Sequence, residues 1–156
     1  MKLLILSDSH GEWHTLRQIA ERECPDAVIH LGDYLGDAQK LSMVCDLTLE
    51  AVPGNCDGLF HKGERSRILT YEGVRFLMTH GHDYRVKTGL EMLVEAGKSM
   101  GVDAVLFGHT HQALIDRAGG GLWLVNPGTA GGIHAPATYA VAQVESGAVS
   151  FELKEV

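Results

Sequence analysis

Five apolar segments of this chain end in a similar way, in short runs of polar residues that mostly include a glycine. The runs are Ser7-Asp8-Ser9-His10, Gly32-Asp33, Gly54-Asn55, His80-Gly81-His82 and Gly108-His109-Thr110-His111. In an open α/β sheet the carboxyl ends of the strands share one edge, and ligands bind outside that edge. Side chains that are far apart in the sequence can therefore meet at one site, where glycine permits sharp turns.

The residues between these runs alternate between patterns typical of strands and of helices. We predict buried strands over 2–7, 27–31, 47–52 and 104–107, a tight hairpin of strands 68–71 and 74–78, and helices over 12–23, 37–43 and 86–100. The later segments 113–117, 122–125, 138–144 and 149–153 alternate like antiparallel strands. Strands that alternate with helices indicate an α/β domain with parallel crossovers.

Composition excludes several classes of protein. A formal net charge of -7 argues against a strong nucleic-acid surface, because such surfaces place clustered Lys and Arg against phosphates. No apolar run approaches the ~18 residues of a membrane span, and the first apolar run meets Asp8 too soon for a signal peptide. Cys24, Cys45 and Cys56 form no C-x-x-C pair, so we expect reduced thiols. We therefore expect a cytoplasmic protein without a membrane segment.

The donors in the five runs indicate a metal site. Aspartate, histidine and asparagine together suit manganese, iron, zinc, cobalt or nickel better than calcium. A single Asp or Asn before a turn is usually there for turn geometry. Five recurrences at strand ends make that explanation much weaker for the whole set.

The five runs, in this order and at these intervals, resemble the calcineurin-like metallophosphoesterase family, and specifically its small single-domain bacterial and archaeal phosphodiesterases. The resemblance extends through Asn126-Pro127-Gly128-Thr129 and so covers nearly the whole chain. It implies one domain over residues 1–156 with an α/β fold, a four-layer α-β-β-α sandwich of two mainly mixed β-sheets flanked by helices.

The resemblance also implies two divalent metal ions, with manganese expected first and nickel, zinc or iron as alternatives. Asp8, His10, Asp33 and His111 would hold one ion, and Asp33, Asn55, His80 and His109 the other, with the Asp33 carboxylate between them. The implied reaction is hydrolysis of phosphate diesters by metal-bound hydroxide. The candidate catalytic residues are Asp33, Asn55, Cys56 and Asp57.

Cys56 departs from the pattern of many relatives, which carry histidine after the Gly-Asn pair. A thiol cannot supply the near-neutral pKa of an imidazole, so we expect substrates with good leaving groups, or assistance from the metal, to be required. Asp57, next in the sequence, is a candidate for orienting a ligand rather than reacting.

Two other functions fit the same pattern. One is a phosphomonoesterase or nucleotide phosphohydrolase. The other is a non-catalytic protein-binding scaffold, because the retromer scaffolding subunit of eukaryotes resembles the same fold, although it lacks part of the histidine set. The expected partner is a small phosphate-ester substrate, and the sequence leaves homo-oligomer formation open.

The chain also offers basic residues that could line the entrance to such a site. They are Lys62, Arg65, Arg67, Arg85 and Lys87, to which His82 and His134 add imidazoles. Solvated loop charges explain the basic residues better than a binding role does, and we expect His134 to be a loop histidine without a role. Sequence alone does not choose among them.

Overall fold

The computed structural model describes residues 1–58 and 63–156, in which ten strands build two five-stranded sheets. The strands are β1 (Lys2–Leu6), β2 (Ala27–His30), β3 (Thr48–Ala51), β4 (Ser66–Tyr71), β5 (Val74–Thr79), β6 (Ala104–Leu106), β7 (Leu114–Arg117), β8 (Trp123–Asn126), β9 (Thr138–Glu145) and β10 (Ala148–Glu155). The α-helices are α1 (Trp13–Glu23), α2 (Leu35–Cys45) and α3 (Glu91–Met100), and a short 3₁₀ turn covers His82–Tyr84.

Both sheets are mixed. The first sheet has the order β10-β9-β1-β2-β3, in which β1, β2 and β3 are parallel and β9 runs antiparallel to β1 and to β10. The second has the order β4-β5-β6-β8-β7, in which β5, β6 and β8 are parallel and the outer strands are antiparallel. Each sheet therefore has a central set of parallel strands whose carboxyl ends share an edge.

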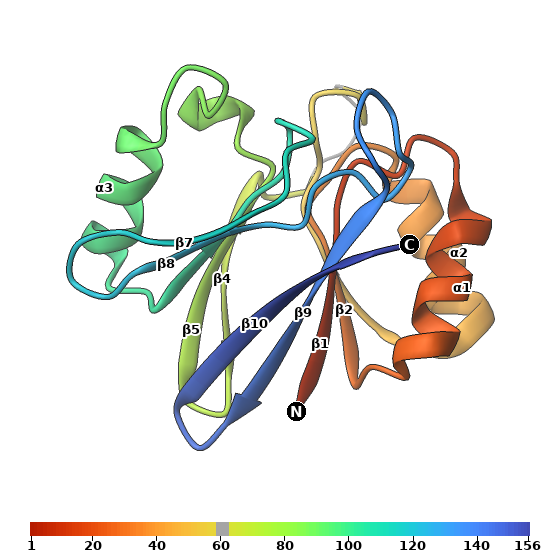
Figure 1. Ribbon diagram of the computed structural model, residues 1–156, viewed down its shortest axis with the longest axis horizontal. Coiled ribbons are helices and arrows are strands. Elements are labelled where there is room, and N and C mark those ends of the chain that lie inside the picture. The colour runs from red at the N-terminus through yellow and green to blue at the C-terminus, as the bar shows by residue number, and fades with distance from the viewer. Residues whose placement is uncertain (59–62) are drawn as a thin grey trace.

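Three apolar clusters hold four layers together. One lies between the sheets and contains Leu3 and Ile29 of the first sheet and Phe76 and Leu106 of the second. Another packs α1 against the outer face of the first sheet, and a third packs α3 against the outer face of the second. Figure 1 shows α1 and α2 on one side of the molecule and α3 on the other. The predicted four-layer α-β-β-α sandwich is confirmed.

Alternation of side chains along β1 and β2 explains why the first sheet is buried on both faces. Leu3 and Ile5 face the other sheet, whereas Leu4 and Leu6 face the helices. Successive side chains of a strand point to opposite faces, so a continuous apolar run suits a strand that is covered twice. Each predicted strand is present within one or two residues of its expected ends.

The predicted helix over 86–100 is wrong at its start, because α3 begins only at Glu91. Arg85 adopts a left-handed conformation (φ 52°) and Gly89 has φ 157°, and neither angle continues an α-helix. Residues 86–90 instead form an irregular connection after the 3₁₀ turn, from which Val86 still contributes to the apolar cluster under α3. The spacing of apolar residues in 86–90 correctly indicated burial, but it did not indicate a helix.

Candidate metal centre

The predicted ligands come from both sheets and converge at one end of the molecule. Asp8 and His10 follow β1, Asp33 follows β2 and Asn55 follows β3. The second sheet contributes three histidines, His80 after β5 and His109 and His111 after β6. The backbone N–H of His109 donates to Asp8 Oδ2 over 3.1 Å, which joins the two sheets at the centre itself.

One set of donors consists of Asp8, His10 and His111. The Nε2 atoms of the two histidines lie 3.3 Å apart, and His111 Nε2 lies 3.1 Å from Asp8 Oδ1. One ligand atom from each of the three residues lies within 4.8 Å of the others. This spacing suits coordination of one cation by all three.

The other set consists of Asn55, His80 and His109. His80 Nε2 lies 3.1 Å from Asn55 Oδ1 and 3.2 Å from His109 Nδ1. His80 is fully buried, whereas Asn55 lies at the surface. The second set therefore opens toward solvent on one side.

Asp33 lies between the two sets. Its Oδ1 is 3.6 Å from His80 Nε2, and its carboxylate also forms a close group with His10 and Cys56. A third close group joins Asp33 to Asp8 and His80. The position is the one expected for a carboxylate that serves both sets.

The protons on two of these histidines are fixed by backbone carbonyls. His80 Nδ1 donates to Leu31 O over 2.7 Å, and His111 Nδ1 donates to Ile133 O over 3.0 Å, because a carbonyl oxygen can only accept. In the neutral imidazole the Nε2 atoms then carry lone pairs that face the centre. Carbonyl partners of this kind orient histidines toward metals.

Two further contacts test whether a cation fits. His80 Nε2 and Asn55 Oδ1 are both acceptors at 3.1 Å in the neutral form, so no proton is available to join them. Asp8 Oδ1 is fully buried and has no hydrogen-bond partner among the described residues. Burial of a carboxylate oxygen without a hydrogen-bond donor costs free energy, and a bound cation would supply the missing partner. The residues present therefore fit divalent metal ions.

Backbone conformation at the centre is unusual. Asp8, His10, Asp33, His109 and His111 all have positive φ angles, between 49° and 69°. Left-handed conformations are uncommon for residues other than glycine and cost free energy, and they gather at functional sites. Five of the seven predicted ligands share this conformation, which the sequence did not signal.

Three glycines allow the loops to approach one another. A Cβ on Gly108 would lie 2.8 Å from Asp8 Oδ2, and one on Gly32 would lie 2.9 Å from His80 Nδ1. A Cβ on Gly54 would lie 2.5 Å from the backbone nitrogen of Asp33. At these positions glycine is needed because backbone passes directly against a ligand residue.

Electrostatics favour the metal-binding charge states of Asp8 and His109, whereas His111 is shifted toward its protonated form. Burial opposes ionisation of Asp8, but the His111, His80 and Ser7 side chains outweigh it and lower its pKa. Burial, His80 and Lys87 lower the pKa of His109 to about 4, so this imidazole is neutral near pH 7. The Asp8 carboxylate raises the pKa of His111, because the protonated imidazole could donate a hydrogen bond to it.

Cys56 and Asp57 occupy different places in the centre. The thiol of Cys56 is exposed beside His10 and Asp33, and partial burial together with the Asp33 carboxylate raises its pKa to about 11. Asp57 instead contacts the backbone of the neighbouring loops. Its carboxylate accepts backbone N–H groups from Asp33, Leu35 and Gly54, each over 2.8 Å. These hydrogen bonds let Asp57 position the loops that carry Asp33 and Asn55.

Supporting contacts come from a turn that follows β8. Asn126 Nδ2 donates to Gly108 O over 3.1 Å and to Thr110 Oγ1 over 3.0 Å. Thr129 Oγ1 donates to Asp8 O over 2.8 Å. The Asn-Pro-Gly-Thr run thus holds the loops that carry Asp8 and His109. The backbone carbonyls of Leu31 and Ile133 also orient ligands, since they accept from His80 and His111. Every residue has such a carbonyl, so the sequence could not reveal these two roles.

The basic candidates separate into distinct environments. Arg65 pairs with Asp83 over 3.0 Å and Arg67 with Glu50 over 2.8 Å, whereas Lys62 lies outside the described residues. Lys87 and His134 line a cavity together with His109 and His111. The His82 ring lies 5.4 Å from that of His80, and its nitrogens have no hydrogen-bond partner among the described residues.

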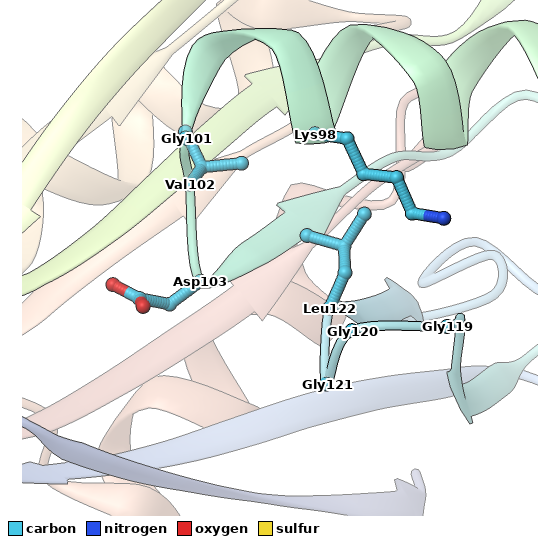
Figure 2. A pocket seen from close by; sticks show the side chains of 8 residues that line it. All are labelled: Lys98, Gly101, Val102, Asp103, Gly119, Gly120, Gly121 and Leu122. Atoms are coloured by element: carbon cyan, nitrogen blue, oxygen red, sulfur yellow. The ribbon is translucent and has the colours of Figure 1, made fainter.

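Another cavity, of about 410 Å³, lies away from this centre (Figure 2). It is formed by the end of α3, the residues that lead into β6 and the turn between β7 and β8, with Lys98 beside the glycines of that turn. Because it lies at the amino end of β6, it is remote from the edge where the ligands gather. We assign it no role in the chemistry.

Comparison with known proteins identifies the family. The family model described as the calcineurin-like phosphoesterase superfamily domain matches residues 1–147. The chain belongs to this superfamily. Membership supports a metal-dependent phosphoester hydrolase, in agreement with the donor set.

Individual relatives agree with this assignment. A probable metallophosphoesterase of Mycoplasma pneumoniae is 34% identical over 131 residues, which cover 82% of this chain and 78% of the relative. A phosphodiesterase of Methanocaldococcus jannaschii is 30% identical over 145 residues, covering 82% and 83%. A zinc complex of wild-type Vps29 from Entamoeba histolytica matches with a TM-score of 0.80 at 18% identity over 99% of both chains, which shows a shared fold.

No helix in the described ranges 1–58 and 63–156 is long and apolar enough to span a membrane.

Proposed function

We propose that the protein is a phosphodiesterase that works with two divalent metal ions. The observation that carries this proposal is the set of nitrogen and oxygen ligand atoms from both sheets that lie 3.1–3.3 Å from one another beside Asp33. Within it, neutral His80 Nε2 and Asn55 Oδ1 face each other as two acceptors, which is repulsive without a cation and favourable with one.

Each ion would have four protein ligands. Asp8, His10, Asp33 and His111 would hold the first, and Asp33, Asn55, His80 and His109 the second. Oxygen and imidazole donors in this mixture suit manganese, and also nickel, zinc or iron. Two ligand carboxylates against two divalent ions leave the centre positive, which favours a phosphate anion although the chain is acidic.

When bound, two divalent cations polarise phosphoryl oxygens and lower the pKa of a water molecule. The residues of the chain supply orientation and charge. The carbonyls of Leu31 and Ile133 keep His80 and His111 in the tautomer that leaves Nε2 free. Asp57 fixes the loops that carry Asp33 and Asn55.

Protonation of the leaving group is the weak part of this centre. The Cys56 thiol, with a pKa of about 11, is a poor proton donor near neutral pH. Esters whose leaving groups are stable as anions should therefore react faster than simple alkyl esters. The phosphodiesterase name of the M. jannaschii relative supports diesters as the substrate class.

The test is reconstitution of metal-stripped protein. Samples loaded with manganese, nickel, zinc, iron or magnesium would be assayed on bis(p-nitrophenyl) phosphate and on p-nitrophenyl phosphate. We expect manganese or nickel to restore hydrolysis of the diester at a higher kcat/KM than that of the monoester. A preference for the monoester would instead assign the protein to the phosphomonoesterases.

A scaffold function is the second candidate, and the likeness to Vps29 favours it. The complete donor set argues for catalysis. Metal-replete protein that is inert on both esters and forms a stable complex with a protein partner would reverse this choice.

A further inference from the structure

Lys87 differs from Arg65 and Arg67 among the basic residues of the entrance. Arg65 and Arg67 are neutralised by Asp83 and Glu50. Lys87 is exposed and forms no ion pair with any residue of the described chain. An unpaired ammonium group close to a phosphate-binding centre is available to a ligand.

Lys87 lies on a cavity of about 350 Å³ that is lined mainly by basic and polar residues. The lining residues are Lys87, His109, Thr110, His111, Gln112, His134 and Ala135. None of them is acidic, although the chain as a whole carries a net charge of -7. Lys87, Gln112 and His134 can each donate a hydrogen bond, so the cavity suits an anion.

The cavity adjoins the candidate metal centre. His109 and His111 line it, and they also lie 3.2 Å from His80 Nε2 and 3.1 Å from Asp8 Oδ1. A ligand in the cavity would thus lie beside the metal ligands. Its volume is near the lower end for small-molecule sites, which suits one substituent of a substrate.

We propose that this cavity binds a second phosphate group of the substrate, with Lys87 and His134 as its ligands. The inference rests on the proposed function, in which the ester under attack is held at the metal centre. The substrate class is then a phosphate diester with a further phosphate on one of its substituents. His134, expected from sequence to be a loop residue without a role, acquires one in this proposal.

A matched pair of substrates tests the inference. Thymidine 5′-(p-nitrophenyl phosphate) and its 3′-phosphorylated form have the same leaving group and the same diester, and differ by one phosphate. We expect kcat/KM to be about tenfold higher for the 3′-phosphorylated ester, mainly through KM, as befits one charged contact. Equal values for the two esters would overturn the proposal.

The variant Lys87→Met should remove this preference and leave kcat/KM for the unphosphorylated ester within about twofold of the native value. The control is Lys98→Met, which removes the same charge from the exposed face of α3, and it should keep the preference. If Lys87→Met lowers kcat/KM equally for the two esters, Lys87 acts on the reacting phosphate and the proposal is wrong.

A binding measurement separates this inference from the proposed function. Calorimetric titration of the metal-loaded protein would compare thymidine 3′,5′-bisphosphate with thymidine 5′-monophosphate. Tighter binding of the bisphosphate that is lost in Lys87→Met supports the second phosphate site, even if neither ester is hydrolysed and the proposed function fails. Equal binding of the two nucleotides by native protein would contradict it.

Discussion

At the scale of single residues, Gly108 explains why a buried strand ends in Gly-His-Thr-His. Two residues that are two apart on a regular strand share a face. His109 and His111 are both left-handed instead, so His109 faces His80 while His111 faces Asp8. Gly108 leaves room for this turn against Ser7 and Asp8.

The first prediction concerns that close approach. In Gly108→Ala the added methyl would lie 2.8 Å from Asp8 Oδ2, and we expect a loss of about 1–3 kcal/mol in unfolding free energy. Metal affinity should fall as well, because Asp8 must move. The control Gly36→Ala, in a helix with nothing within 4 Å, should stabilise by about 0.5–1 kcal/mol. Urea unfolding measures the free energy of unfolding of both variants. An unchanged unfolding free energy in Gly108→Ala would refute the packing argument.

The second prediction concerns Asp33. Asp33→Ala removes the carboxylate that lies within reach of both donor sets, so metal content and hydrolysis should be lost together. Changes in the residues that merely support a ligand cost about 10–100-fold, and this loss should be larger. Metal analysis and diester assays are the measurements, with exposed Asp116→Ala as the control. Retention of both properties in Asp33→Ala would sink the two-metal assignment.

At the scale of elements, Glu23 ties the end of α1 to the first sheet. Its buried carboxylate lies 2.7 Å from Lys2 Nζ on β1 and 3.1 Å from Lys154 Nζ on β10, and it accepts the hydroxyl of Tyr139 on β9. Burial opposes ionisation of Glu23, but these three partners outweigh it and lower its pKa to about 2. One ionised side chain therefore joins four elements.

The third prediction follows from the sign of that shift. A folded pKa below the ordinary 4.5 stabilises the native state fully above pH 4.5, and the contribution disappears as pH falls toward 2. Metal-free protein should lose on the order of 2 kcal/mol from this group between pH 7 and pH 3. Glu23→Gln should lack this component, which urea unfolding across that range would measure. The same acid sensitivity in Glu23→Gln would show that other groups cause it.

Prediction from sequence was most accurate for elements with a clear pattern of apolar residues. The apolar run Leu3 to Leu6 predicted a buried strand, and the polar runs after such strands located Asp8, Asp33, His80 and His109. The prediction of where α3 begins was wrong. The spacing of Val86 and Leu90 indicates that they are buried, but it says nothing about the backbone angles of Arg85 and Gly89. The carbonyls that orient His80 and His111 leave no trace in residue type.

At the scale of the whole molecule, the candidate metal centre joins the two sheets. Asp8, Asp33 and Asn55 extend from the first sheet, and His80, His109 and His111 from the second. Each donor set contains residues of both sheets. Bound metal should therefore stabilise the sandwich as a unit and not one loop alone.

The fourth prediction is a thermal shift. A ligand at 100 times its Kd stabilises the native state by about 2.7 kcal/mol, which for a domain of this size raises Tm by roughly 5–10 °C. Manganese added to metal-free protein should produce such a shift, and Asp33→Ala should not show it. Differential scanning calorimetry with matched magnesium and manganese titrations is the measurement. A native protein whose Tm ignores every divalent ion tested would contradict a metal centre between the sheets.

The division of the ligands between two sheets also affects the order of events during folding. The chain must be synthesised beyond His111, and both sheets must have paired and docked, before either donor set is complete. Contacts between residues as distant in sequence as Asp8 and His111 form late, because their loop-closure entropy is lost before they stabilise anything. Metal uptake would accordingly mark the end of folding, and a nascent chain or a half-docked intermediate would bind neither ion well.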